Sequence, residues 1–380
     1  MAQKQRSLLR RILRWTFIGL GSFILMVGVF LGVFFNFAPV VGGNPEGERL
    51  ARIEASPLYK DGQFQNSVET MMEMSFSDML GIMGEQLNPG PERSPAATIQ
   101  TVPFDAKTWA EDTTDQLKVT WFGHSSLLVR LEGKTFLLDP VFGKRASMFS
   151  FMGPERFDYE YHVTVEDMPP LDGVIISHDH YDHLDYPTID KLKDIVPHFY
   201  VPLGIGAHLE RWGVQLDQIS ETEWWDEIVI HDSLSLINTP SRHFSGRGMT
   251  NRFSTLWSSW VIQGKKQRLY FSGDSGYFPG FKEIGDKYGP FDIALMECGA
   301  YNKLWSEIHL MPEESVQAAV DLQARVYLPV HWGKFDLALH PWKEPVQRMM
   351  KKAKSTGMKV QGPLVGQVVV VGTPVPEKVW

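Results

Sequence analysis

Apolar residues form one long run near the N-terminus and many short runs after residue 117. The long run covers residues 15–41 and contains no charged side chain. A helix needs about 20 apolar residues to cross the hydrocarbon core of a bilayer, whereas the apolar part of a cleaved signal peptide has about 7–15. The pattern therefore predicts an uncleaved transmembrane helix, with a cleaved signal peptide as the alternative.

The short apolar runs are typical of strands, because they end at turn residues such as Gly and Asp-Pro. They predict strands at residues 119–122, 127–131, 135–138, 174–176, 199–201, 234–238, 257–263, 269–272, 292–296, 326–330 and 368–371. Helices are expected at residues 186–195, 206–212 and 312–323, the last beginning at a favourable Pro312. Groups of strands separated by helices predict a layered α/β domain.

Residues 42–116 contain repeated Gly and Pro breaks and are expected to form a connector. Within it, apolar residues recur at spacings of 3 and 4 over residues 66–86, which predicts an amphipathic helical arm. This arm would either pack on the following domain or face lipid. The chain is thus divided into a basic segment (1–14), a transmembrane anchor (15–41), the connector and helical arm (42–116) and one large domain (117–380).

The charges before the apolar run predict its orientation. Five basic residues and no acidic residue precede it: Lys4, Arg6, Arg10, Arg11 and Arg14. By the positive-inside rule, the N-terminus of this single-pass protein is cytoplasmic and the large domain is extracytoplasmic. Removing these five charges from the net charge of −8 leaves −13 for the rest of the chain, which argues against nucleic acid as a partner.

The segment SHDHYDHLD, residues 177–185, concentrates histidines directly after a predicted strand. Neutral imidazole and carboxylate groups are the ligands of zinc and similar ions. His178 and His180 could bind one ion, while Asp182 and His183 could bind a second. Without a cation, four ionisable groups packed this closely would be electrostatically costly. The segment therefore predicts a site for two metal ions.

Three more candidate ligands follow predicted strands at the point where each apolar run ends: His243, Asp274 and His331. Polar side chains at strand ends are placed by a rigid scaffold and are common in functional sites. We expect His243 to complete the first ion's ligands with His178 and His180. His331 would complete the second, and Asp274 would bridge the two ions.

The order HxHxDH, His, Asp, His resembles the metallo-β-lactamase fold, an αββα sandwich with its metal site along one edge. Several shorter motifs resemble one branch, the zinc-dependent phospholipase D that hydrolyses N-acylphosphatidylethanolamine: WFGH at 121–124, DPVF at 139–142, MGPERF at 152–157, WW at 224–225, GDSGY at 273–277 and HWG at 331–333. The resemblance covers roughly residues 56–371. It implies two zinc ions held by His178, His180, Asp182, His183, His243, Asp274 and His331, and a homodimer. The transmembrane anchor departs from this family's pattern.

Four other residues are assigned roles. His309 precedes the helix predicted at Pro312, and the resemblance implies that it binds the substrate phosphate or donates a proton. Tyr181, inside the histidine cluster, is a candidate substrate contact. Asp139 either fixes the histidine loop or caps a turn. His124, at a strand end, could support the site in the same way as Asp139.

The sequence therefore predicts a membrane-anchored di-zinc hydrolase that cleaves N-acylphosphatidylethanolamine or a related glycerophospholipid by attack of a metal-bound hydroxide. Asp182, Asp274 and His309 are the expected catalytic residues, and a phospholipid and the membrane are the expected partners. The alternative is a lactonase or a phosphodiesterase for a small soluble substrate. A metal-bound scaffold without turnover is disfavoured because the ligand set leaves room for water.

Overall fold

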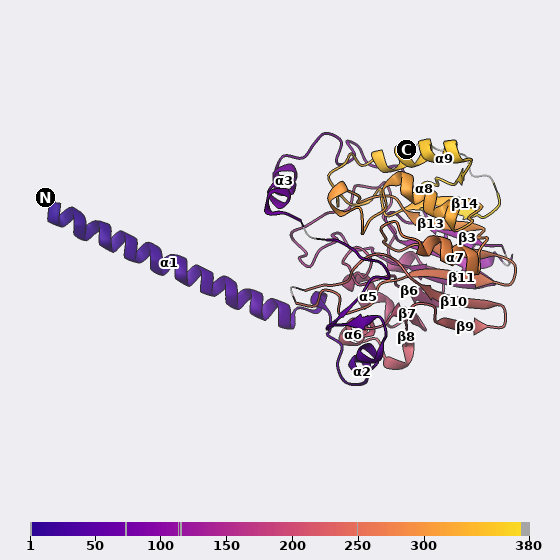
Figure 1. Ribbon diagram of the computed structural model, residues 1–380, viewed down its shortest axis with the longest axis horizontal. Helices are drawn as coiled ribbons and strands as arrows, with labels where there is room; N and C mark the ends of the chain where they lie inside the picture. The colour runs from indigo at the N-terminus through magenta and orange to yellow at the C-terminus, as the bar shows by residue number, and fades with distance from the viewer. Residues whose placement is uncertain (1, 73, 113, 115, 249, 374–380) are drawn as a thin grey trace.

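The computed structural model describes residues 2–72, 74–112, 114, 116–248 and 250–373. A long helix leads into a layered domain, from which it projects (Figure 1). This helix, α1, runs over Ala2–Phe37, and its part from Arg10 to Phe37 is long and apolar enough to cross a membrane. That part would span about 42 Å at 1.5 Å per residue, more than the ~30 Å hydrocarbon core. A signal sequence meets the same criteria.

Two sheets form the centre of the domain, each with seven strands among the described residues. The first contains, in spatial order, β16 (Val368–Val370), β3 (Lys118–Trp121), β4 (Leu127–Leu131), β5 (Lys134–Leu138), β6 (Gly173–Ile175), β7 (Phe199–Pro202) and β8 (Ile219–Thr222). The second contains β15 (Lys359–Val360), β14 (Val326–Val330), β13 (Ile293–Glu297), β12 (Arg268–Phe271), β11 (Ser259–Gly264), β10 (Leu234–Thr239) and β9 (Glu227–His231).

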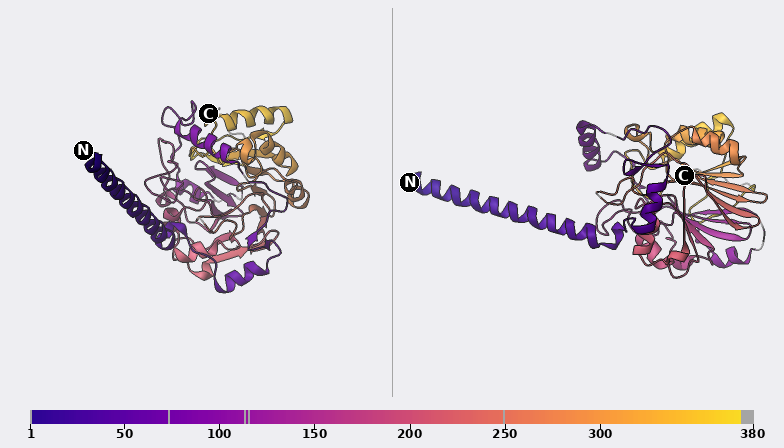
Figure 2. Two further views of the ribbon diagram at one scale, coloured as in Figure 1. Left: turned by 60° about the vertical axis from the view of Figure 1, so that its left-hand side comes forward. Right: turned by 60° about the horizontal axis from the view of Figure 1, so that its bottom comes forward.

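Successive side chains of a strand point to opposite faces of the sheet, and in the first sheet both faces are apolar and buried. In β4, Leu127 and Val129 belong to the core between the sheets, whereas Leu128 packs with the helices on the outer face. The outer helices there are α5 (Tyr186–Leu192) and α6 (Gly206–Arg211). The second sheet is covered by α7 (Gly280–Tyr288), α8 (Pro312–Asp321) and α9 (Glu344–Thr356), as Figure 2 shows. The layers confirm the predicted αββα sandwich.

Strand direction collects the functional loops at one edge. In the first sheet, β5 to β8 run parallel, and β3 has the same direction because β4 is antiparallel to both β3 and β5. In the second sheet, β12 to β15 run parallel, and β10 has the same direction because β11 is antiparallel to both β10 and β12. The carboxyl ends of β3, β5, β6, β10, β12, β13 and β14 therefore lie along this edge. In α/β sheets this is where ligands bind.

Residues 42–116 do more than connect. They form α2 (Gly47–Ala55), the hairpin β1 (Tyr59–Lys60) and β2 (Gln63–Phe64), α3 (Phe76–Leu87) and α4 (Ala106–Glu111). Ile53 and Phe64 are buried in one cluster with Trp257 of the large domain. The segment therefore belongs to the folded body, and of its three helices α3 alone has no buried residue among those described.

Several predicted boundaries are wrong. The helical arm begins at Phe76 instead of residue 66, because Ser75 and Asp78 form a capping box that starts the helix there. The apolar helix ends at Phe37, and residues Pro39–Val41 form a separate 3-10 turn, η1.

The sequence predictions missed α2, α4, α7, α9, β1, β2, β8, β9 and β15.

Candidate metal centre

Two groups of potential ligands meet at the carboxyl edge of the sheets. The first contains His178 and His180 from the loop after β6, His243 after β10 and Asp274 after β12. His180 Nδ1 lies 2.9 Å from His178 Nε2 and 3.2 Å from His243 Nε2. Asp274 Oδ2 lies 3.7 Å from His178 Nε2 and 3.8 Å from His243 Nε2. Four nitrogen and oxygen ligands thus point at a single position.

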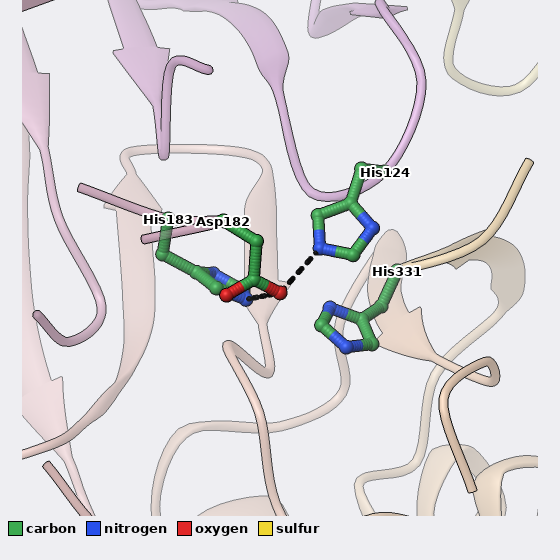
Figure 3. Close-up of side chains that lie close together, drawn as sticks. All are labelled: His124, Asp182, His183 and His331. Atoms are coloured by element: carbon green, nitrogen blue, oxygen red, sulfur yellow. Dashed lines mark hydrogen bonds and ion pairs between the residues drawn. The ribbon is translucent and has the colours of Figure 1, made fainter. Parts of the chain in front are cut away.

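The second group contains Asp182 and His183 from the same loop, His331 directly after β14, and His124 after β3 (Figure 3). His124 Nε2 lies 2.8 Å from Asp182 Oδ2, and His183 Nε2 lies 3.6 Å from that oxygen. The structure thus brings all seven predicted ligands together. It also adds His124, which the sequence suggested only as a supporting residue.

Asp274 lies between the two groups. Its Oδ2 faces the first group, while its Oδ1 lies 3.2 Å from His183 Nε2 and 3.0 Å from His331 Nδ1. A carboxylate with one oxygen toward each group is suited to bridge two ions. This placement agrees with the bridging position expected for Asp274.

Asp139, at the end of β5, holds the ligand loop. Its Oδ2 lies 2.6 Å from His183 Nδ1, and its Oδ1 accepts a hydrogen bond from the Ser177 backbone N–H at 2.7 Å. These contacts orient the His183 ring with Nε2 toward the second group, as outer carboxylates do for metal-ligating histidines. These contacts agree with the interpretation that Asp139 fixes the histidine loop, and not with the interpretation that it caps a turn.

Backbone strain marks the same edge. His124, Asp139 and His331 have φ values of 54°, 37° and 63°, in the left-handed region that non-glycine residues rarely adopt. Each such residue costs of order 1–3 kcal/mol and persists only where the surroundings hold it. The fold therefore maintains an unfavourable backbone in order to aim these side chains.

Burial and neighbouring charges together set the pKa values of the two groups, and His183 differs from the other residues. Burial acts to raise the pKa of Asp182 and Asp274, but the adjacent histidines outweigh it and hold both pKa values well below the usual range. Burial also holds the pKa of His178 and His243 well below the usual range. For His183 burial is opposed by Asp274 and Asp182, which raise its pKa well above the usual range. Metal binding would therefore have to displace a proton from His183.

Unpaired buried atoms show that these residues fit a cation. Among the described side chains, His183 Nε2, His331 Nε2 and Asp274 Oδ1 are buried and make no hydrogen bond of acceptable geometry, although Asp274 Oδ1 lies within 3.2 Å of both rings. Each unpaired group costs about 1–3 kcal/mol. A divalent ion would satisfy all three atoms, because imidazole nitrogen and carboxylate oxygen are its ordinary ligands.

His309 lies beside both groups and has a carboxylate partner that the sequence predictions missed. Glu297, the last residue of β13, is fully buried, and its Oε2 lies 3.0 Å from His309 Nδ1. Its Oε1 accepts the Leu310 backbone N–H at 2.7 Å. Burial and the charge of Asp274 raise the pKa of Glu297 well above its usual range. The only sequence signal was an acidic residue ending an apolar strand.

A cavity of about 300 Å³ opens onto the ligands. Its described walls are largely apolar and include one basic side chain, Arg252. The site residues in the wall are His180, Asp182, Asp274, His309 and His331, and the apolar residues are Met72, Met74, Phe244, Ala300, Leu304, Trp305, Ile308 and Leu337. Tyr181 is not among the described lining residues. Its hydroxyl donates to the Arg247 carbonyl at 2.5 Å, so the expected substrate contact by Tyr181 has no support in this arrangement.

The αββα fold and the paired His and Asp groups at its edge define a metallohydrolase class of protein. A family model described as the beta-lactamase superfamily domain matches residues 134–332, just over half of the chain. The chain belongs to this superfamily, in its metallo-β-lactamase form.

Relatives cover different shares of the chain. An uncharacterized protein of Mycobacterium tuberculosis is 39% identical over 366 residues, 95% of this chain and 96% of that protein. The N-acyl-phosphatidylethanolamine-hydrolyzing phospholipase D 1 of Caenorhabditis elegans is 37% identical over 232 residues, 58% of this chain and 65% of that enzyme. Among solved structures, a metallo hydrolase from the archaeon Ignicoccus hospitalis has a TM-score of 0.52 at 22% identity, covering 67% of this chain and 97% of that one. The structural match supports the fold alone.

Proposed function

We propose that the chain is a membrane-anchored di-zinc phosphodiesterase that cleaves N-acylphosphatidylethanolamine, or a related glycerophospholipid, in the manner of a phospholipase D. The observation that carries the proposal is the placement of Asp274 between two ligand groups, with one oxygen toward each, in the wall of a largely apolar cavity. The similarity to the worm enzyme supports the substrate class.

Zinc suits the ligands, because all are imidazole nitrogens or carboxylate oxygens. His178, His180 and His243 would hold one ion, Asp182, His183 and His331 the other, with Asp274 between them and His124 supporting Asp182. When bound, the two ions would neutralise the phosphodiester charge and lower the pKa of water enough to make it a nucleophile at neutral pH.

The cavity wall fits a phospholipid. Met72, Phe244 and Leu304 offer apolar contacts suited to acyl chains, and Arg252 offers a cation for the phosphate. The Arg252 guanidinium lies 4.7 Å from the Phe244 ring centre, and none of the ion pairs among the described residues includes Arg252. An unpaired cation beside the ligands can bind an anionic substrate without first losing a carboxylate partner.

His309 is the residue proposed to protonate the leaving alcohol. Its Nδ1 is engaged by Glu297, so Nε2 is the nitrogen left for the substrate. The ring stacks on His331 with centroids 5.3 Å apart, so His309 lies beside the second ligand group, within reach of a phosphate bound there. Positioned general acids of this kind typically contribute about 10²–10⁴-fold to rate.

The membrane assignment depends on α1 and α3. We propose that α1 anchors the chain with its N-terminus in the cytoplasm and the domain outside, following the basic residues before the apolar run. In Figures 1 and 2, α3 stands out from the domain on the side from which α1 projects. Both features would bring the cavity to a lipid surface.

The test is hydrolysis of N-acylphosphatidylethanolamine by detergent-solubilised full-length protein. The zinc-loaded protein should release phosphatidic acid, and a chelator should abolish release. His180→Ala should lower the rate by about 10²–10³-fold through loss of electrostatic stabilisation. The matched control is His198→Ala, because His198 precedes β7 at the opposite edge and its imidazole hydrogen-bonds to Ser220, away from the ligand groups.

The outcome against the proposal is also defined. If zinc-loaded protein leaves this lipid intact but hydrolyses a small soluble phosphodiester or a lactone, the phospholipase assignment is wrong while the metal centre stands. If neither substrate class is hydrolysed by metal-loaded protein, the hydrolase mechanism itself is contradicted.

A further inference from the structure

The end of α1 is fastened to the domain beside the ligand loop. We call residues 39–43 the helix foot and residues 178–183 the ligand loop. The Trp212 indole N–H donates to the Pro39 carbonyl at 2.6 Å, and an Arg211 N–H donates to the Asn36 carbonyl at 2.9 Å. The foot thus docks against the C-terminal end of α6 instead of passing through solvent.

Gly42 makes the docking close. Its φ of +80° is in the left-handed region, and a Cβ atom there would lie 2.1 Å from His208 Nδ1. The foot therefore lies directly on the buried His208 imidazole of α6, at a separation that no side chain at position 42 allows.

Arg247 joins the foot to the ligand loop. Its side chain is only 1% exposed. Nε and Nη2 donate to the Val40 carbonyl at 3.2 and 2.9 Å. Nη1 donates to the Asp179 carbonyl at 2.6 Å and to the Leu184 carbonyl at 2.7 Å. Asp179 lies between ligands His178 and His180, and Leu184 follows ligand His183, so one guanidinium holds both ends of the loop.

A second connection runs through the side chain of Asp179. His208 Nε2 lies 3.2 Å from Asp179 Oδ2, which also accepts the Thr255 hydroxyl at 2.9 Å. The Gly246 N–H donates to Asp179 Oδ1 at 2.7 Å. The residue under Gly42 is thus bonded to the residue between the first two ligands.

We infer that Arg247 is a positioning residue of the metal centre and that the helix foot is part of the same support, so that the seating of α1 on the domain sets the metal affinity of the ligand loop. The inference rests on the metal centre proposed above, and it does not depend on the substrate. The Arg247 guanidinium can play this role because its planar group of N–H donors bonds to the carbonyls of Val40, Asp179 and Leu184 at the same time. Lysine keeps the charge but cannot make this set of bonds.

The experiment measures zinc affinity of the full-length protein in detergent by competition with a chromophoric chelator. Arg247→Lys should weaken zinc binding by about 10–100-fold, the range found for outer groups that orient metal ligands. Gly42→Ala should also weaken it by about tenfold, although residue 42 touches no ligand. The matched control is Gly47→Ala, because Gly47 also has a positive φ, +55°, but has open space around its Cβ.

Two further measurements separate positioning from general stability. The absorption spectrum of the cobalt-substituted protein should shift in Arg247→Lys and Gly42→Ala and stay unchanged in Gly47→Ala, because it reports ligand geometry. Thermal unfolding of each variant in excess chelator shows whether the metal-free fold is intact.

Each outcome has one meaning. Weakened zinc binding and a shifted spectrum in both variants, with an intact metal-free fold, support the inference. Wild-type affinity and spectrum in Gly42→Ala overturn the role of the foot, and the same result in Arg247→Lys overturns the positioning role. A wild-type protein that binds no metal overturns the metal centre and this inference with it.

Discussion

Glu297 shows how one buried carboxylate decides what a neighbouring histidine can do. It engages His309 Nδ1 and the Leu310 N–H with its two oxygens. In Glu297→Gln the amide oxygen can still accept the Leu310 N–H and the NH₂ group can face His309 Nδ1, but an amide cannot exchange a proton with the ring as a carboxyl group can. We expect kcat to fall by about 10–100-fold with little change in KM.

The control for this prediction is Glu283→Gln, the same substitution at an exposed position of α7. Steady-state kinetics and zinc content of both variants provide the test. Unchanged kcat in Glu297→Gln, at full zinc content, would rule out proton exchange between the Glu297 carboxyl group and His309.

At this scale the sequence predicted the ligands better than their supports. His243, Asp274 and His331 were found because each follows an apolar run, and strand direction does bring such positions to one edge. Glu297 and Arg247 carried no comparable signal, since their roles come from contacts between distant segments: Arg247 bonds to Val40, 207 positions away.

The most unusual single element is α3. None of its residues is buried, and it presents five large apolar side chains to the exterior: Phe76, Met79, Leu80, Met83 and Leu87. Soluble surfaces rarely gather such residues without a partner. Met72 and Met74, just before α3, line the cavity, so the helix follows directly on the cavity wall.

We expect α3 to lie in the lipid interface and to help phospholipid enter the cavity. Phe76→Gln with Met83→Gln should lower hydrolysis of bilayer substrate by at least about 10²-fold, because burying each of the two side chains contributes about 1.5–3 kcal/mol. Hydrolysis of a short-chain substrate below its micellar concentration should not change. The control pair is Leu216→Gln with Val229→Gln, both equally exposed at 66%. Equal losses on both substrates would contradict the interfacial role.

Element boundaries failed where capping and burial, not periodicity, decide them. Hydrophobic spacing alone extended the arm back to residue 66, but Asn66 instead bonds to the His243 backbone, accepting its N–H at 3.1 Å and donating to its carbonyl at 2.8 Å. Residues 42–116 were expected to form a connector because Ile53 and Phe64 are isolated apolar residues in a Gly- and Pro-rich segment. Their burial with Trp257 depends on a contact with the large domain, which hydrophobic spacing does not show.

For the whole molecule, the sequence pattern was enough to predict a layered fold. It was not enough to predict how the N-terminal helix is fastened to the domain. The strand groups and helices predict a layered α/β domain, the family resemblance implies its αββα form, and superfamily membership confirms that form. The seating of α1 on α6 and Arg247 could not be read from the chain, because the contacts use backbone carbonyls that every sequence has. Homodimerisation and the cytoplasmic N-terminus stay predictions.

The central claim is a centre for two metal ions that share Asp274, and metal analysis of the purified chain tests it most directly. After reconstitution with zinc and removal of excess metal, the wild type should contain two zinc ions per chain. Asp274→Asn should lose both, since its two oxygens face the two ligand groups. His180→Ala should keep the ion of the second group. A wild-type chain that holds one ion or none, or an Asp274→Asn variant that keeps two, would contradict the account.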